Sequence, residues 1–417
     1  MLSLSNWNLV LVFVVYLRPV SSQCRQSYIT ICDTFEDFRN LSDTENVSDM
    51  MIGSEDGHTN MTAVDLMKTL QLNKFHKLTT LMIVRAIKHL EITEEFYECR
   101  YENLSLQHLI LYGNVLKSVE PYHFPIMDPL KRLSLVNNQI ESLKKYAFIN
   151  HDIENFDLSD NLLELIEGSS FPLFRSTRVI TLKNNKLTHI EPRSFPESLE
   201  TLHLDRNRLR YIQDEVLQPL NNLKEFTLSH NNLNSLPNIE PLKQLVSFDI
   251  SYNTISTVKK DTFKNMKNLK FLDLSNNRIN NPMILKWIYT PQEQPKLTVS
   301  LAFNRLKDVD LHGGVSQNQT LVLYGNPWDC DKWHDLQSKL SRHESECDKK
   351  FSATNEVPHC INYTNVNIKP GFGRAGMFEP YIDKFHSTIK GNEKIVGCVL
   401  QERKYEVLFT KFTVCVA

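Results

Sequence analysis

The stretch Leu269–Ile279, LKFLDLSNNRI, decides the fold of this chain. Leu272 and Leu274 sit on either side of a polar residue, and this alternation predicts a short strand with one buried face. Asn277 follows where the chain must turn, and an Asn side chain can bond loop backbone that has no strand partner. Ile279 then closes the turn over the core. One unit of this size cannot bury its own apolar face, so we expect copies stacked above and below it.

The frame of this stretch recurs along the chain. Ten copies are clear, and most successive asparagines are 22 to 24 residues apart. The step from Asn277 to Asn304 is 27 residues, which predicts an insertion around Pro282–Pro295. A degenerate copy without the Asn is expected at Leu78–Ile83. The asparagines of the ten copies are Asn114, Asn138, Asn161, Asn185, Asn207, Asn231, Asn253, Asn277, Asn304 and Asn326.

Two further apolar columns keep the same register and predict a packed convex wall. Five residues after the Asn come Val119, Leu143, Ile166, Ile190, Ile212, Leu236 and Val258. Ten residues after the Asn come Phe124, Phe148, Phe171, Phe195, Leu217, Phe263 and Trp287.

This pattern, Leu-x-x-Leu-x-Leu-x-x-Asn-x-Ile, resembles the leucine-rich repeat. The resemblance implies an α/β solenoid with a curved parallel sheet on its concave face and short 3₁₀ or extended segments on its convex face. About ten to eleven repeats are expected within residues 61–326. A solenoid grows in one dimension, so 417 residues need no second core.

The first residues predict export. Leu9–Leu17 is an apolar run too short to span a bilayer, and small residues before Gln23 offer a cleavage site. We therefore expect a signal peptide at residues 1–22, with a signal anchor as the alternative. No later stretch predicts a transmembrane helix, so a secreted, extracellular protein is expected. The predicted glycosylation sites are Asn40, Asn46, Asn60, Asn103, Asn318 and Asn362.

Residues 23–60 are predicted to be an N-terminal cysteine loop followed by an acidic, solvated and partly flexible segment. Cys24 and Cys32 are close enough in sequence to bridge this loop. A binding site for a basic partner is the alternative interpretation of the acidic stretch. The repeats are then expected to begin near Met61.

The array is predicted to end in a cysteine-containing cap at residues 327–360. The stretch from Tyr324 to Asp331, YGNPWDCD, resembles the C-terminal cap of extracellular leucine-rich repeat proteins, although Lys332 stands where the usual cap has a second Cys. A helix carrying Trp333, Leu336 and Leu340 would cover the last repeat. Residues 361–417 form a small cysteine-containing tail whose fold the sequence does not predict.

All eight cysteines lie in the expected mature chain, where disulfides form readily. About nine strand steps of roughly 5 Å separate the two ends of the array. Disulfide Cα atoms lie within about 7 Å, so the two ends should not pair with each other unless the tail folds back. Each end then has an odd number, which leaves a free thiol, such as Cys99, or an intermolecular bridge and a disulfide-linked dimer. The disulfide candidates are Cys24, Cys32, Cys330, Cys347, Cys360, Cys398 and Cys415.

The sequence shows no convincing catalytic or metal site, and no cofactor is expected. Asp205, His203, His230 and Ser229 could mimic a catalytic triad on neighbouring strands, but nothing supplies an oxyanion hole. His203 and His230 could pair on a metal, but no third ligand is evident. The net charge of −2 argues against a general nucleic-acid binder.

The concave face is the predicted binding surface, because large aromatic side chains are the usual anchors of protein interfaces. Tyr252, Phe271 and Phe303 are expected to cluster over successive repeats, with ordinary exposed aromatics as the alternative. The candidate ligand-binding residues are Tyr112, Lys183, Asp205, Arg206, His230, Tyr252, Phe271, Phe303 and Tyr324.

The repeats and the Asn-Pro-Trp-x-Cys cap make the chain similar to secreted leucine-rich repeat proteins. In outline it also resembles the insect leucine-rich immune molecules, in a short form without a coiled coil. The resemblance implies recognition of an extracellular protein or microbial ligand, with innate immunity as one role. The alternative is an extracellular matrix or adhesion component, or a developmental ligand-binding protein.

Overall fold

A computed structural model describes most of the repeat array and a few residues beyond it. The described residues are 30–32, 41, 44–53, 59–62, 74–91, 100–101, 105–121, 124, 126–127, 130–148, 153–171, 176–288, 297–310, 320–332, 335, 338, 360–361, 382 and 386–387.

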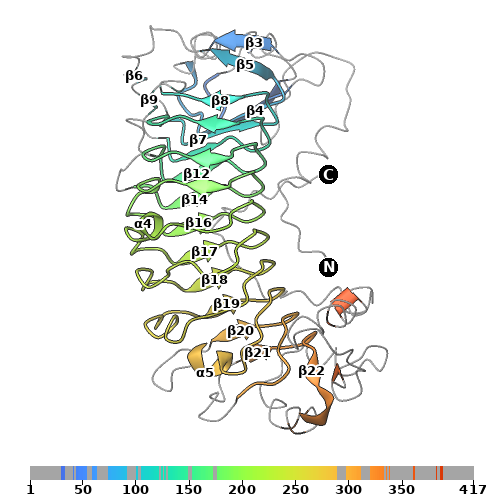
Figure 1. Cartoon of the computed structure of the whole chain (residues 1–417). Coiled ribbons are helices and arrows are strands. Elements are labelled where there is room, and N and C mark those ends of the chain that lie inside the picture. The colour runs from blue at the N-terminus through green and yellow to red at the C-terminus, as the bar shows by residue number, and fades with distance from the viewer. Residues whose placement is uncertain are drawn as a thin grey trace.

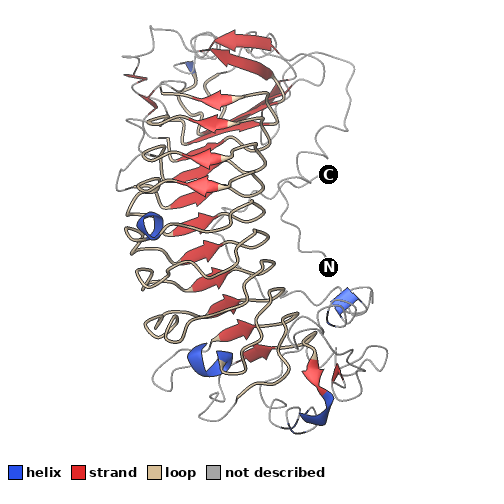
Figure 2. Cartoon of the chain, viewed as in Figure 1, coloured by secondary structure: helices blue, strands red, loops and turns tan. Residues whose placement is uncertain are grey.

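One parallel sheet of 13 strands runs the length of the molecule (Figures 1 and 2). The predicted leucine-rich repeat solenoid is therefore confirmed, and its strands follow one another in chain order. Their bounds are β1 Thr30–Cys32, β2 Asp49–Gly53, β4 Thr80–Val84, β7 His108–Tyr112, β10 Arg132–Ser134, β12 Asn155–Asp157, β14 Val179–Thr181, β16 Thr201–His203, β17 Glu225–Thr227, β18 Ser247–Asp249, β19 Phe271–Asp273, β20 Thr298–Ser300 and β21 Thr320–Val322.

The convex side consists of short segments, as expected. Two-residue strands pair there in parallel, β8 (Ser118–Val119) with β11 (Ser142–Leu143), and β13 (Leu165–Ile166) with β15 (His189–Ile190). Two short helices interrupt this side, α4, Asp214–Leu217, and α5, Ile284–Ile288. The remaining short strands are β3 Thr59–Thr62, β5 Ile87–Glu91, β6 Arg100–Tyr101, β9 Ile126–Met127, β22 Trp328–Asp329 and β23 Cys360–Ile361.

The asparagines form a buried ladder that links each repeat to the one before it. Asn231 is typical: its Nδ2 donates to the carbonyl oxygens of Leu204 at 2.9 Å and Leu228 at 3.0 Å. Its Oδ1 accepts the Leu209 N–H at 3.0 Å. Because these backbone groups have no partner in the sheet, the side chain satisfies polar groups that burial would otherwise leave unpaired.

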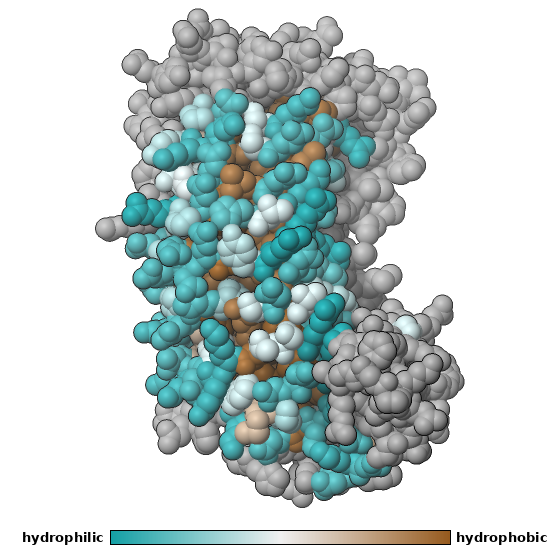
Figure 3. Space-filling model, in the orientation of Figure 1, coloured by the Kyte–Doolittle hydropathy of each residue, from teal (hydrophilic) through white to brown (hydrophobic). Residues whose placement is uncertain are grey.

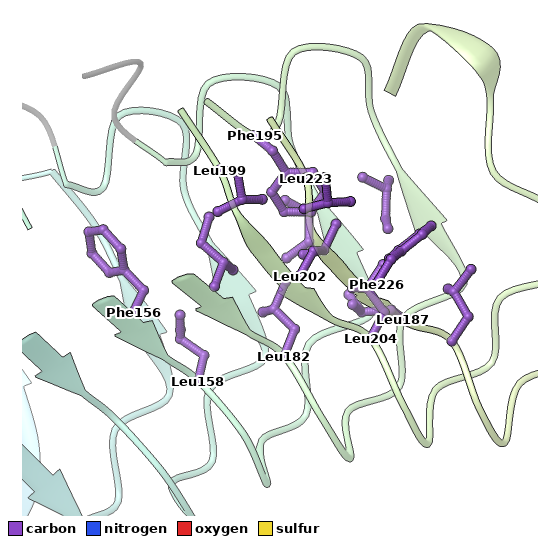
Figure 4. Packing of buried hydrophobic residues seen from close by; sticks show 14 of the residues in the cluster. Phe156, Leu158, Leu182, Leu187, Phe195, Leu199, Leu202, Leu204, Leu223 and Phe226 are labelled. Atoms are coloured by element: carbon purple, nitrogen blue, oxygen red, sulfur yellow. The ribbon is translucent and has the colours of Figure 1, made fainter. Parts of the chain in front are cut away.

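Leucines and phenylalanines fill the space between the sheet and the convex wall. Figure 4 shows Leu202, Leu204 and Phe226 pointing into this interior from the strands. Behind them, the Phe171 ring stacks on Phe148 and on Phe195, with centroids 6.0 Å apart in each pair. The predicted phenylalanine column is confirmed in this part of the array. Trp287 departs from it, since α5 buries Ile284, Leu285 and Ile288 and leaves Trp287 half-buried.

The sheet begins earlier than the predicted start near Met61, and this boundary needs correction. Strand β1 pairs with β2, and β2 pairs with β4, within residues assigned to the N-terminal loop and acidic segment. Met50 and Ile52 of β2 are fully buried. Asp49–Gly53 is thus a strand, not a solvated segment. The acidic residues around it hid its alternating apolar pattern.

The C-terminal end is only partly described. Trp328 is 3% exposed, and β22 pairs in parallel with β23. Strand pairing therefore joins the predicted cap to Cys360–Ile361. The residues expected on the apolar face of the cap helix are Trp333, Leu336 and Leu340. They lie outside the described residues, as does most of the tail.

Candidate concave binding surface

The residue before each ladder asparagine adopts a left-handed backbone. Arg206, His230, Tyr252 and Phe303 have φ between +52° and +55°. Asn, Asp and Gly tolerate this conformation, and the other equivalent positions hold these residue types: Gly113, Asn137, Asp160, Asn184, Asn276 and Gly325. The four bulkier residues therefore carry a backbone cost that smaller residues would avoid. We call these turn positions, from Arg85 to Gly325, the left-handed column.

Backbone hydrogen bonds hold the left-handed column in line. The N–H of His230 donates to the Ser251 carbonyl at 3.1 Å, and the N–H of Tyr252 donates to the Ser275 carbonyl at 3.0 Å. The side chains consequently stack along one border of the concave sheet. A signal for this column is present in the sequence, since Asn, Asp and Gly recur just before the repeated asparagine.

His230 and Tyr252 are in direct contact within this column. Their rings stack with centroids 4.1 Å apart and planes 11° apart. Burial, and then the nearby Arg206 guanidinium, lower the pKa of His230. Burial, and then the carboxylates of Asp273 and Asp249, raise the pKa of Tyr252. Both rings are thus neutral near pH 7 and form a flat, polarizable platform.

Asp205 is the centre of a polar network at the middle of the concave face. Its Oδ2 accepts the Thr227 hydroxyl at 2.6 Å and lies 3.6 Å from Lys183 Nζ. Its Oδ1 accepts both the backbone N–H and the hydroxyl of Ser229, at 3.1 and 2.9 Å. Burial acts to raise the pKa of Asp205, but Lys183, these hydrogen bonds and His203 outweigh it, so the pKa is lowered. The network stabilises three neighbouring strands.

This geometry does not make a catalytic relay. Asp205 bonds Ser229 directly, and His203 Nε2 instead lies 3.1 Å from Glu225 Oε1. No histidine therefore bridges the serine and the aspartate, as a triad requires. Among the described residues no group of three or more His, Cys, Asp or Glu could hold a metal ion.

The predicted aromatic cluster is divided between two borders of the sheet. Phe271 opens β19 and is 37% exposed, whereas Tyr252, 41% exposed, belongs to the left-handed column. The left-handed residue in the repeat of Phe271 is Asn276, five residues later. At about 3.3 Å per residue that is on the order of 15 Å along the chain. One partner side chain therefore cannot contact both aromatics, which corrects the expected cluster.

Phe303 is not an open anchor, because it is half-buried at the C-terminal end. Its ring makes edge contacts with Tyr324, at 5.3 Å between centroids, and with His386, at 5.9 Å. A Cβ on Gly325 would lie 2.8 Å from the Phe303 ring. His386 belongs to the tail, so the sequence alone could not foresee this contact. The tail reaches the last coils at this point.

Two aspartates lie between the separated aromatics. Asp249 and Asp273 are direct neighbours on β18 and β19, and each accepts the N–H of the serine two residues later, at 3.0 and 2.9 Å. No lysine or arginine occupies an outward position of β18–β20 or the turn residue that follows each strand. This part of the concave face is therefore acidic, and only the strand register brings its two aspartates together. We call Asp249, Tyr252, Phe271 and Asp273 the concave patch.

The other predicted residues are spread along the sheet. Tyr112 ends β7 near one end of the array, and Tyr324 lies near the other, both half-buried. Arg206 is exposed in the left-handed column. Cys32 and Cys330 are in disulfides. Of the predicted glycosylation sites, Asn46 is exposed and Asn60 lies in β3, while Asn40, Asn103, Asn318 and Asn362 lie outside the described residues.

Known families match the array. A "Leucine rich repeat" model matches residues 197–253 and 243–281, and a "BspA type Leucine rich repeat region (6 copies)" model matches residues 57–171 and 91–205. Together these models extend over residues 57–281, more than half of the chain.

Curated relatives match over shorter stretches. Mouse (Mus musculus) podocan is 32% identical over 115 residues, which cover 27% of this chain and 18% of podocan. Mouse leucine-rich repeats and immunoglobulin-like domains protein 2 is 33% identical over 111 residues, 26% of this chain and 10% of that protein. The match thus spans less than a fifth of either relative.

A solved structure shares the fold. One chain of the octameric complex of Latrophilin 3, Unc5D and the FLRT2 leucine-rich repeat region matches with a TM-score of 0.52 and 21% identity. The match covers 76% of this chain and 88% of that one. Among the described residues, no helix has the length and apolar character to cross a membrane. On its repeats, its sheet and these matches, the chain belongs to the leucine-rich repeat proteins.

Proposed function

We propose that this chain is an extracellular recognition protein that binds a protein partner through the concave patch. The observation that carries the proposal is that the concave patch combines exposed aromatic side chains with acidic residues. Only four large hydrophobic side chains are exposed among the described residues, and Tyr252 and Phe271 are the two on the concave side. Aromatic side chains held at the edge of a polar surface are frequent interface hot spots.

Backbone strain adds support for this region. Tyr252 and His230 occupy left-handed positions where Asn or Gly would cost less, by about 1–2 kcal/mol per residue. Strained positions cluster at functional sites, because the surrounding structure over-determines them. The stacked rings of His230 and Tyr252 then present a fixed platform that loses little entropy on binding.

The charge of the concave patch indicates the partner's chemistry. Asp249 and Asp273 lie side by side and give this part of the sheet a negative charge, with 4% and 9% of each residue exposed. A lysine or arginine of the partner would be attracted to this charge. The expected partner surface therefore combines a basic side chain with apolar groups that cover Tyr252 and Phe271.

Two finer roles fit such a module. Innate immunity is supported by the resemblance to insect leucine-rich immune molecules in the cap and cysteine pattern. A growth-factor-related role is favoured by 30% identity to a protein named transforming growth factor beta activator LRRC32 from Pongo abelii, of which the match covers 22%. Infection-induced expression would favour the first role, and steady expression in one developing tissue the second.

An intermolecular disulfide is part of the proposal. Cys32 and Cys330 are already in disulfides, and each uses a second cysteine, so the bridging thiol belongs to the cysteines outside these bonds. A non-reducing gel of secreted protein should show a band near twice the monomer mass. A purely monomeric band together with titratable thiols would contradict the proposed covalent dimer.

The test is a comparative pull-down from extracellular fluid. Wild type, a Tyr252→Ser/Phe271→Ser variant and a Tyr146→Ser/Tyr211→Ser control serve as baits. Tyr146 is a close match for Tyr252, being 48% exposed with φ +64°, but it lies outside the concave strands. We expect a partner that the wild type and the control recover and the concave variant loses. Equal recovery by all three baits would overturn the concave site.

A further inference from the structure

Lysines gather on the return arcs of the two repeats that lead into β18 and β19. Six lysines are exposed within residues 243–270. The exposed carboxylates are Asp261 within this stretch and Glu240 just before it. The chain as a whole has a net charge of −2, so positive charge is concentrated here. We call these six residues the lysine arc: Lys243, Lys259, Lys260, Lys264, Lys267 and Lys270.

The fold places these lysines on the outside of the coil. Phe263 and Met266 alternate with them and are each 1% exposed, so the apolar side chains point inward and the lysines outward. Tight turns keep the arc compact: the Lys264 N–H donates to the Asp261 carbonyl at 3.1 Å. Asn268 Nδ2 reaches the Lys243 carbonyl at 3.3 Å, which brings the preceding coil alongside.

None of the six ammonium groups has an ion pair or side-chain hydrogen bond within the described structure. Some cations elsewhere in the array are paired: Lys183 faces Asp205, and Lys224 lies 2.7 Å from Glu200. Six neighbouring positive charges repel one another and attract mobile anions to this surface. An anionic polymer would replace those anions with a gain in entropy from released counterions.

We propose that the lysine arc binds a sulfated polysaccharide. The arc is built only from lysines, which act as point charges and suit the spread negative charge of a polyanion better than a single bidentate contact. Between Thr257 and Lys270 it exposes no aromatic ring on which a nucleic-acid base could stack, and the exposed Tyr252 and Phe271 belong to the concave patch. Its apolar side chains are buried, so it has nothing to insert into a membrane surface. The choice of a sulfated polymer also rests on the proposed extracellular location.

The test uses heparin as the probe and the full chain. Affinity is measured across a salt series for wild type and for a variant with Lys259, Lys260, Lys264 and Lys267 changed to Gln. The control changes four exposed lysines of the N-terminal half to Gln, Lys117, Lys131, Lys144 and Lys145, and so removes the same charge. Thermal melts of both variants establish that they fold.

The arc variant should lose at least about tenfold in heparin affinity. The slope of log K against the logarithm of the salt concentration should become less negative by about three. The control should lose less than about twofold. Equal losses in the two variants, or no heparin binding by wild type at low salt, would overturn the site. Tighter binding to phosphatidylserine vesicles or to DNA than to heparin would overturn the choice of polymer. The concave patch is unchanged in these variants, so failure here is distinct from failure of the protein-binding proposal.

Discussion

The imidazole of His230 lies flat against the phenol ring of Tyr252, with 4.1 Å between centroids and 11° between planes. The contact joins successive repeats at their left-handed turns and exposes 41% of Tyr252 on the concave side. A mobile surface tyrosine is thereby fixed against its neighbour.

His230 should titrate below its ordinary value of 6.5, because burial and then Arg206 disfavour its charged form, with partial opposition from Asp249 and Asp205. A folded-state pKa below the unfolded value gives stability that is present above the unfolded pKa and lost as the pH falls through the folded one. An NMR titration of the His230 ring measures this, and His230→Gln should remove that part of the pH dependence. A midpoint at or above 6.5 would contradict the stacked arrangement.

Asn231→Ala should destabilise the array by about 1–3 kcal/mol, because the carbonyls of Leu204 and Leu228 and the Leu209 N–H lose their buried partner. Chemical denaturation gives the change in unfolding free energy. Asn232→Ala, at the exposed neighbouring position, is the control and should change stability by less than about 0.5 kcal/mol. Equal effects of the two substitutions would rule out the ladder as a stabilising element.

Asp205→Asn should cost about 1.5–3 kcal/mol at pH 7, because charge-assisted hydrogen bonds to Thr227 and Ser229 are lost. The pKa of Asp205 is lowered in the fold, so its stabilisation is present above the ordinary value near 3.8 and is lost as the pH falls further. Unfolding free energies of wild type and variant should therefore converge at acid pH. If the difference in unfolding free energy between wild type and variant grows on acidification, the charged form of Asp205 is not the stabilising one.

Gly325→Ala should destabilise the last repeats by about 1–3 kcal/mol, since φ is +72° and the added Cβ would lie 2.8 Å from the Phe303 ring. Gly53→Ala is the matched control, because the atom nearest to its Cβ would be 3.7 Å away. Combining Gly325→Ala with Phe303→Ala should cost less than the sum of the two single changes. Strict additivity in this double-mutant cycle would place the ring elsewhere.

Much of the fold is predictable because its determinants are local and periodic. Leu272 and Leu274 are buried in and beside β19, and Asn277 bonds its own turn and that of the preceding repeat. Strand β2 escaped prediction because acidic residues surround its short apolar alternation. In the space-filling view of Figure 3, hydrophilic side chains flank a hydrophobic strip along the array, as alternating patterns require.

The candidate site is less predictable, because it depends on backbone direction and on distant contacts. Tyr252 and Phe271 hold different positions in their repeats, and the left-handed turn, which alternation does not encode, directs the Tyr252 side chain to the border of the sheet. Phe303 meets His386 from far along the chain, which no periodic pattern encodes. Asp249 and Asp273 were visible in the sequence, but their adjacency follows only from the strand register.

The most direct test of the account is the affinity of the recovered partner for two purified double variants. Truncated hot spots cost 2 kcal/mol or more, so Tyr252→Ser/Phe271→Ser should weaken the Kd at least about 30-fold. Tyr146→Ser/Tyr211→Ser, which removes equally exposed rings outside the concave strands, should stay within about threefold of wild type. Wild-type affinity in the concave variant together with a loss in the control variant would contradict binding through the concave patch.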